Sequence, residues 1–260
     1  MKIPTFAADM TYQIREFTCR SAGNRLWGEA FVPASPGRHP ALILSHGYNV
    51  NHRHFQRLAE HFSGEGYVCS CFDFAGGSVN SKSEGRSVDM SVFTERQNLM
   101  DILELVRTWD CVDPERIFLL GESLGGSVTA ITAPQVADRI RGIVLSFPAF
   151  CVPADGYAQF PALEDIPDSF EMMGMTIGKG YLQPFYEGYD FYDDIVKYTG
   201  PVLIIHGTED PLVAPSYSIK AARLYRNSEL RWIDGAGHGF YSPEQRELYF
   251  TYISDFLGRN

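Results

Sequence analysis

The chain has 260 residues, of which 45% are hydrophobic and 21% charged, so it can bury a sizeable core and fits one large domain better than two. Its formal net charge of −10 disfavours nucleic acid and anionic membranes as partners, because phosphate groups repel an acidic surface. No run approaches the roughly 20 apolar residues of a membrane-spanning helix, and residues 1–9 contain no long apolar stretch typical of a secretory signal.

The N-terminal part of the chain predicts a strand pair and then an alternation of strands and helices. Alternating apolar and polar residues over 12–17 and 26–32, with a turn at 21–24, indicate a hairpin. A continuous apolar run at 41–44 is typical of a strand buried on both faces. The pattern then predicts a helix at 54–62, a strand at 67–74, a helix at 92–109 and a strand that leads into Ser123. We therefore expect an α/β fold with a mostly parallel sheet and helices on both faces.

The cysteines and histidines of this part form no recognisable disulfide or metal pattern. Cys69 and Cys71 alternate within the predicted strand, which favours buried, reduced thiols over a disulfide framework or a zinc site. No cluster of cysteines or carboxylates accompanies His52 and His54, so we expect these two in a loop or at a helix start. The sequence therefore predicts no metal site and a location in the reducing cytoplasm.

Residues 121–125, with the sequence GESLG, follow an apolar strand and precede an apolar helix. The G-x-S-x-G pattern is typical of a nucleophile elbow, a tight turn that exposes a serine hydroxyl above the edge of a sheet. Gly121 and Gly125 suit this turn because a Cβ at either position would collide across it. Glu122 is expected only to occupy the variable position. Because the pattern also arises in ordinary glycine-rich turns, its interpretation depends on two residues further along the chain.

Beyond the elbow the alternation of strands and helices is interrupted once. A buried strand at 142–146 is followed by residues 149–198, which are rich in aromatic residues and methionine. A structureless loop of this length is uncommon in a compact domain, so we expect short helices and hairpins there. The alternation then resumes with a strand at 202–205, a helix at 216–225, a strand at 230–233 and a helix at 243–257.

Two loops after the late strands carry an acid and a histidine. Asp210 follows the strand at 202–205, and His238 follows the strand at 230–233. The carboxyl ends of parallel strands share one edge of a sheet, so we expect Ser123, Asp210 and His238 at the same rim. A neutral imidazole can take the proton of a serine hydroxyl, and a carboxylate can orient that imidazole. These residue types in this place indicate nucleophilic catalysis by the serine.

Together these motifs resemble the α/β-hydrolase superfamily. They are the turn 46–48 (HGY) after a buried strand, the elbow, the loop 207–211 (GTEDP), the pair Gly237-His238, and the chain order serine, acid, histidine. The resemblance runs from about residue 25 to 258. It implies a single domain over residues 1–260, an eight-stranded, mostly parallel sheet, and a cap of about residues 149–198 inserted after strand 6.

Within the superfamily the chain is most similar to bacterial carboxylesterases of the cinnamoyl or feruloyl esterase type. This narrower resemblance depends on the strand end 72–74, the Gly/Ser-rich loop that runs to Gly85, and the aromatic insertion. It implies that three polar cap residues, Asp155, Gln159 and Tyr181, bind the ring hydroxyl of a hydroxycinnamate. Residues 75–78 depart from the Gly-His-Gly that relatives often carry.

The superfamily resemblance also implies roles around the serine. The backbone N–H of Leu124, directly after the nucleophile, and that of Tyr48 would bind the oxyanion. His46 usually supports the oxyanion turn, although a direct role as a base is an alternative. The acid is expected directly before Pro211.

Two other carboxylates are alternatives near the acid and the histidine. Glu209 could act in place of Asp210, but it is free to face solvent. Asp234 lies four residues before His238 and is expected to form the turn ahead of Gly235.

The function that follows is a serine esterase that cleaves short-chain or aromatic acyl esters through an acyl-enzyme. We expect no cofactor and a small-molecule ester as the partner, and a homodimer is left open. The elbow does not distinguish an esterase from a serine aminopeptidase or an acyltransferase, because all three share the acyl-enzyme. A non-catalytic binding module on a hydrolase scaffold is an alternative from another class.

Overall fold

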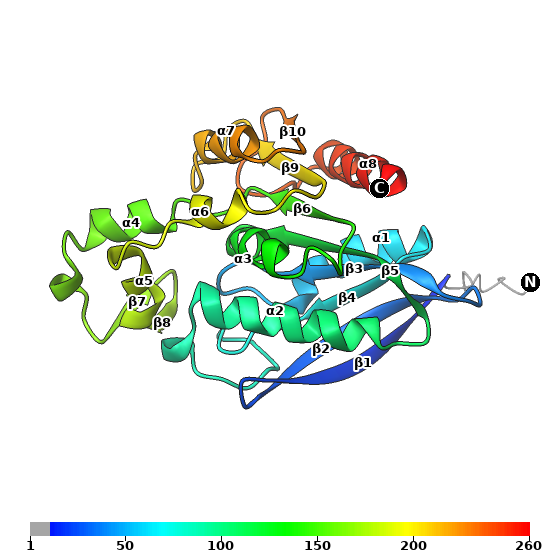
Figure 1. Cartoon of the computed structure of the whole chain (residues 1–260), viewed down its shortest axis with the longest axis horizontal. Helices are drawn as coiled ribbons and strands as arrows, with labels where there is room; N and C mark the ends of the chain where they lie inside the picture. The colour runs from blue at the N-terminus through cyan, green and yellow to red at the C-terminus, as the bar shows by residue number, and fades with distance from the viewer. Residues whose placement is uncertain (1–10) are drawn as a thin grey trace, which may run out of the picture.

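A central sheet of eight strands runs through the computed structural model, which describes residues 11–260 (Figure 1). The strands are β1 (Tyr12–Ser21), β2 (Asn24–Pro33), β3 (His39–Ser45), β4 (Val68–Phe72), β5 (Val112–Glu122), β6 (Gly142–Ser146), β9 (Val202–Gly207) and β10 (Ser228–Ile233). Their order is β1-β2-β4-β3-β5-β6-β9-β10. β2 is antiparallel to both of its neighbours, and all other pairs are parallel. The predicted α/β-hydrolase fold is confirmed, whereas the prediction about a secretory signal in residues 1–9 lies outside the described residues.

Helices cover both faces of the sheet (Figure 1). On one face lie α2 (Val92–Arg107), α3 (Leu124–Thr132) and α7 (Pro215–Leu224), and on the other lie α1 (Gln56–Gly64) and α8 (Pro243–Arg259). Alternate residues of a strand point to opposite faces, as β5 shows. Ile117 and Leu119 join the core cluster formed with α2, α3 and α7, whereas Phe118 and Leu120 join the cluster formed with α1 and α8. The apolar runs of the central strands are therefore buried on both sides.

Capping residues fix where several helices begin. α2 follows Ser91, whose hydroxyl accepts a hydrogen bond from the Thr94 N–H while the Thr94 hydroxyl accepts one from the Ser91 N–H. Ser242 and Gln245 form the same box at the start of α8. The predicted helix at 54–62 is observed as a 3-10 turn, His52–Phe55, followed by α1. The turn begins before residue 54 because the Asn51 side chain caps it by accepting from the Arg53 N–H.

The segment between β6 and β9 forms short elements of its own. They are α4 (Val152–Gln159), β7 (Ser169–Met172), β8 (Met175–Gly178), α5 (Gln183–Tyr186) and α6 (Phe191–Ile195). Figure 1 shows α4, α5, β7 and β8 together at one end of the molecule, far from the C terminus. The β7–β8 hairpin is tied to the loop after β3, because the Tyr48 hydroxyl donates to the Met172 carbonyl at 2.9 Å and the Asn49 side chain donates to the Met173 carbonyl at 3.1 Å. We refer to residues 149–198 as the cap.

The cysteines are all free, and Cys69 and Cys71 are buried in β4 as predicted. In residues 11–260, no group of three or more His, Cys, Asp or Glu side chains is arranged to hold a metal ion. No helix within that range combines the length and apolarity that crossing a bilayer requires.

Candidate active site

Ser123 lies in the tight turn between β5 and α3, with φ of 53° and ψ of −122°. This conformation is unfavourable for a residue with a side chain and persists only where neighbouring structure holds it. The Ser123 N–H donates to the Ser146 carbonyl at 3.0 Å, and the Ser123 carbonyl accepts from the Ala149 N–H at 2.9 Å. Both partners come from the end of β6 and the residues after it. The turn is therefore fixed by the neighbouring strand, and the serine side chain is left at the rim of the sheet.

Glycine is required at Gly125 because the α3 backbone lies directly against the end of β3. A Cβ at this position would overlap the carbonyl oxygens of Ser45 and His46. We expect Gly125→Ala to lower the free energy of unfolding by about 3 kcal/mol, since the backbone itself would have to move. Chemical denaturation would measure the loss. Gly180→Ala is the matched control, because nothing lies within 4 Å of that Cβ position, and an equal change in both variants would contradict the steric argument.

The structure brings the serine, the acid and the histidine into one chain of hydrogen bonds. His238 Nε2 lies 2.9 Å from Ser123 Oγ, and His238 Nδ1 lies 2.8 Å from Asp210 Oδ2. The other Asp210 oxygen accepts from the N–H groups of Leu212 and Val213, each at 2.9 Å. Although burial alone would raise it, these donors and the two neighbouring histidines hold the pKa of Asp210 well below its usual range. Asp210 is thus a buried carboxylate that directs the imidazole toward the serine.

The alternative acids lie elsewhere. Glu209 is exposed to solvent, and Asp234 is an exposed residue that accepts a hydrogen bond from the Thr208 hydroxyl at 3.2 Å. Of these carboxylates, only Asp210 contacts the His238 ring.

The predicted oxyanion donors lie on the two backbone segments that flank Ser123. Leu124 is the first residue of α3, so its N–H has no partner within the helix. On the other side, a Cβ built on Gly47 would lie 3.1 Å from the Ser123 Cβ, which places the turn 46–48 against the serine. His46 anchors this turn, because its Nε2 accepts from the Phe74 N–H at 3.1 Å and its Nδ1 contacts the Gly47 carbonyl at 2.8 Å. Burial lowers the pKa of His46 to about 4, so the ring is neutral and acts as a support.

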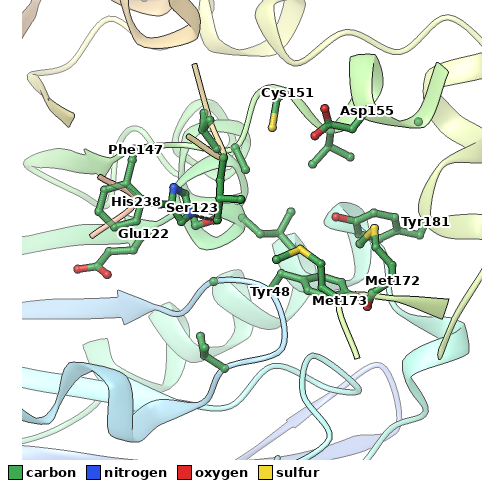
Figure 2. A pocket seen from close by; sticks show the side chains of 18 of the residues that line it. Tyr48, Glu122, Ser123, Phe147, Cys151, Asp155, Met172, Met173, Tyr181 and His238 are labelled. Atoms are coloured by element: carbon green, nitrogen blue, oxygen red, sulfur yellow. Dashed lines mark hydrogen bonds between the residues drawn. The ribbon is translucent and has the colours of Figure 1, made fainter. Parts of the chain in front are cut away.

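Ser123 opens into a cavity of about 350 Å³ beneath the cap (Figure 2). The three polar cap residues predicted from the sequence, Asp155, Gln159 and Tyr181, all line it, and so do Tyr48 and Leu124. Most other lining residues are apolar, among them Phe147, Val152, Met172, Met173, Leu182, Leu212 and Val213. The cavity is therefore an apolar slot with a few polar groups, the usual form of a small-molecule site.

Cys151 also lines the cavity, but its chemistry differs from that of the serine. Burial, together with the neighbouring Asp155 carboxylate, raises the pKa of the Cys151 thiol to about 12. The thiolate is the nucleophilic form of cysteine, so this side chain stays protonated and unreactive at neutral pH. Ser123 is the candidate nucleophile of the cavity.

Residues 37–186, more than half of the chain, match the family model described as serine aminopeptidase, S33. The chain belongs to this family of α/β-hydrolases. Alpha/beta hydrolase domain-containing protein 17C from Xenopus laevis is a relative with 28% identity over 259 residues, which cover 95% of this chain and 71% of the relative. The human alpha/beta hydrolase domain-containing protein 17B is 27% identical over 260 residues, covering 95% of this chain and 77% of the relative.

Solved structures of bacterial esterases share the fold of this α/β-hydrolase. A structure of Est1E from Butyrivibrio proteoclasticus with ferulic acid bound superposes with a TM-score of 0.83 at 25% sequence identity. That match covers 94% of this chain and 98% of Est1E. An acetyl xylan esterase from Paenibacillus sp. R4 superposes with a TM-score of 0.72 at 16% identity, covering 98% of this chain and 87% of the esterase, which shows a common fold.

In this α/β-hydrolase a second histidine, which the sequence did not reveal, also contacts Asp210. His206 is fully buried, its Nε2 lies 3.3 Å from Asp210 Oδ2 and 2.9 Å from the Val213 carbonyl, and its Nδ1 contacts the Ser218 hydroxyl at 2.7 Å. Its position at the end of β9, four residues before Asp210, is the feature of the sequence that could have indicated this contact. His206 and His238 thus both contact the same oxygen of the acid, Asp210 Oδ2.

The expectation that Glu122 only occupies the variable position was wrong, because its side chain has a specific partner. Glu122 is buried beside the serine, and its Oε2 lies 2.6 Å from His54 Nε2. The His52 ring and N–H both contact Asp73 Oδ1 at 2.7 Å. The two histidines do lie at the 3-10 turn, as the sequence predicts, but carboxylates from distant strand ends accompany them.

Proposed function

We propose that this α/β-hydrolase is a serine esterase that cleaves carboxylic esters through an acyl-enzyme. The observation that carries the proposal is the unbroken series of hydrogen bonds from Asp210 through His238 to Ser123 at the floor of an apolar cavity. A serine hydroxyl becomes a strong nucleophile when a neutral imidazole can take its proton during attack. A carboxylate held in its charged form stabilises the imidazolium that results.

The steps of the reaction follow from this geometry. Ser123 Oγ attacks the ester carbonyl while His238 Nε2 takes its proton, and the developing oxyanion is bound by the N–H groups of Tyr48 and Leu124. The imidazolium then gives the proton to the leaving alcohol, and the acyl group stays on Ser123. Water attacks the acyl-enzyme in the second half, with His238 again as the base, and the acid is released.

The cavity supports short-chain or aromatic acyl groups as the substrate class. Figure 2 shows the methionines 172 and 173 and the ring of Tyr48 around the space next to Ser123, with Asp155 and Tyr181 on the far side. Burial holds the pKa of the Tyr181 hydroxyl well above its usual value, so it remains a neutral donor. We propose that Asp155 and Tyr181, with Gln159, bind a ring hydroxyl of a hydroxycinnamoyl group, in line with the ferulic acid bound to Est1E.

Labelling and burst kinetics test the proposed function. A fluorophosphonate probe is expected to label Ser123, and p-nitrophenyl butyrate and methyl ferulate are expected to give a burst of alcohol release followed by steady turnover. Peptide mapping would identify the labelled residue. Absence of label on Ser123 would favour a binding module without catalysis.

Asp155→Ala is expected to lower kcat/KM for methyl ferulate about tenfold or more and to leave p-nitrophenyl butyrate nearly unaffected. The reason is that a butyryl group has no hydroxyl for the carboxylate to bind, whereas a hydrogen bond to a charged group contributes about 1.5–3 kcal/mol. Steady-state kinetics on both esters would measure the ratio. Asp168→Ala is the control, because this exposed cap aspartate does not line the cavity. Equal losses on both esters would remove Asp155 from the acyl site.

The family description favours one second candidate, a serine aminopeptidase. The same three residues would serve it, because amides and esters form the same acyl-enzyme. Turnover of aminoacyl p-nitroanilides in preference to butyryl and feruloyl esters would replace the esterase proposal with this one.

A further inference from the structure

The cavity extends from Ser123 in two directions (Figure 2). The side lined by Asp155, Gln159, Met172, Met173 and Tyr181 lies under the cap, and we call it the acyl end. In Figure 2, Glu122, Phe147 and His238 lie on the other side of Ser123.

The part of the cavity on this second side of Ser123 is the one that would receive the leaving alcohol. We call the part lined by Glu122, Phe147 and His54, which contacts Glu122, the alcohol end. The Phe147 ring packs edge-on against the His238 ring, with centroids 4.7 Å apart. The imidazolium of His238 must give its proton to the leaving oxygen, so this oxygen lies next to His238 when the acyl group fills the cap side. The groups at the alcohol end are therefore the ones that the alcohol half of an ester meets.

An ion pair between Glu122 and His54 lies at the alcohol end. Glu122 accepts from the Tyr249 hydroxyl at 2.8 Å through Oε1 and contacts His54 Nε2 at 2.6 Å through Oε2. Tyr249 in turn accepts from the Ser146 hydroxyl at 2.8 Å, because its only proton is given to Glu122. The carboxylate is thus held from β6 and α8, with only 9% of its side chain exposed. This anchoring fixes the orientation of the His54 ring.

Glu122 contacts only one of the two ring nitrogens of His54. Nε2 is used by Glu122, and Nδ1 has no hydrogen-bond partner within residues 11–260. The His54 side chain is 38% exposed, whereas its carboxylate partner is buried. In the imidazolium form Nδ1 carries a proton, so it is a donor. A purely structural pair would need no free donor at a cavity wall beside the reacting serine.

We propose that His54, oriented by Glu122, binds an oxygen acceptor on the alcohol half of the substrate. The substrates favoured by this subsite are esters of polyols or of hydroxy acids, over esters of simple alkyl alcohols. The inference rests on the proposed esterase function and adds a second specificity element to it, at the end of the cavity opposite to the cap residues.

The test uses three butyrate esters that differ only in the alcohol: propyl, 2-hydroxyethyl and carboxymethyl butyrate. For the wild-type protein and His54→Phe, kcat/KM of each oxygen-bearing ester is divided by kcat/KM of the propyl ester. We expect His54→Phe to lower this ratio about tenfold, because it removes a hydrogen bond that a charged donor makes. A fall for both esters indicates recognition of an oxygen acceptor whether or not it is charged, and a fall for the carboxymethyl ester alone indicates recognition of an anion.

His61→Gln is the matched control. His61 also pairs with a carboxylate, Glu65 at 3.1 Å, but it lies in α1 outside the cavity, so its loss is expected to leave the ratios unchanged. An unchanged ratio in His54→Phe overturns the inference while the esterase function stands. If the wild-type protein hydrolyses none of the three esters, the proposed function fails and the inference fails with it. Labelling of Ser123 by a fluorophosphonate in His54→Phe shows that the variant is folded.

The pH dependence of the kcat/KM ratio in the wild-type protein tests the inference independently of any variant. The Glu122 carboxylate raises the pKa of His54, so the imidazolium is present below that pKa and is lost as the pH rises through it. The titratable and charged groups around His54 are Glu122 of β5, with Tyr249 of α8 behind it, His46 after β3, and its neighbours His52 and Arg53. We expect the ratio for the carboxymethyl ester to fall over this pH range. Any pH dependence of the catalytic steps that both esters share cancels in the ratio, and a ratio independent of pH contradicts the inference.

Discussion

Ser123→Ala is expected to reduce the hydrolysis of p-nitrophenyl butyrate by at least about 10⁴-fold. The variant keeps the cavity and both proposed oxyanion donors, so we expect a weak residual acceleration over water. It lacks the oxygen that attacks the carbonyl, and the Cys151 thiol, which also lines the cavity, does not replace it because it is protonated. The burst of alcohol release and the fluorophosphonate label are expected to disappear together. Steady-state and single-turnover kinetics would measure both.

Ser127→Ala is the matched control for this experiment. Ser127 lies one turn further along α3, is fully buried, and its hydroxyl has no hydrogen-bond partner in the described part of the chain. Its removal is expected to leave kcat within about twofold, because no reacting group contacts it. Full activity of Ser123→Ala in a preparation free of wild-type protein would exclude the acyl-enzyme mechanism.

Asp210→Asn is expected to lower kcat by about 10⁴-fold with little change in the shape of the site. An amide can donate to His238 Nδ1, which would place the ring proton on Nε2 and leave no lone pair to take the proton of Ser123. The amide also carries no charge to stabilise the imidazolium. Kinetics with p-nitrophenyl butyrate would measure the loss in kcat, and KM is expected to change far less, because Asp210 does not line the cavity.

Glu209→Gln removes a neighbouring carboxylate and serves as the control for Asp210→Asn. Glu209 is exposed to solvent, so we expect activity close to that of the wild-type protein. A larger loss in Glu209→Gln than in Asp210→Asn would reverse the assignment of the acid.

Asp210 also contributes to stability in a way that depends on pH. Its pKa is depressed in the folded protein, so the carboxylate stabilises the fold above its unfolded pKa of about 3.9 and the contribution is lost as the pH falls through the lower folded value. Asp210→Asn lacks this contribution at neutral pH. Thermal unfolding of the variant separates a loss of stability from the loss of catalysis.

The placement of the three site residues could be predicted from the sequence because it depends on topology and not on side-chain detail. Parallel strands end at one edge, and the register of the sheet places Gly121 beside Ser45, Glu122 beside Ser146, and Ile233 beside Gly207. Any residue that directly follows such a strand reaches the same rim. The apolar runs and the glycine spacing that mark these strands and the elbow are local features of the sequence.

The partners of Glu122 and His52 could not be predicted, because they arise from packing between segments far apart in the chain. Glu122 meets His54 across 68 residues and Tyr249 across 127. His52 meets Asp73 only because β4 ends beside the 3-10 turn. Single residues of this kind carry no periodic signal. Likewise, no local pattern marks the start of β5 at Val112, because residues 113–116 (DPER) interrupt the apolar pattern.

The two hydrogen bonds between the loop after β3 and the β7–β8 hairpin have a mechanical consequence. Tyr48, whose amide we propose to bind the oxyanion, also donates from its phenol to the hairpin, and Asn49 adds a second hydrogen bond one residue later. In the proposed mechanism, the hairpin at the acyl end and the peptide that binds the oxyanion are thus joined by two hydrogen bonds. We therefore expect a substrate that displaces the hairpin to displace the oxyanion amide with it.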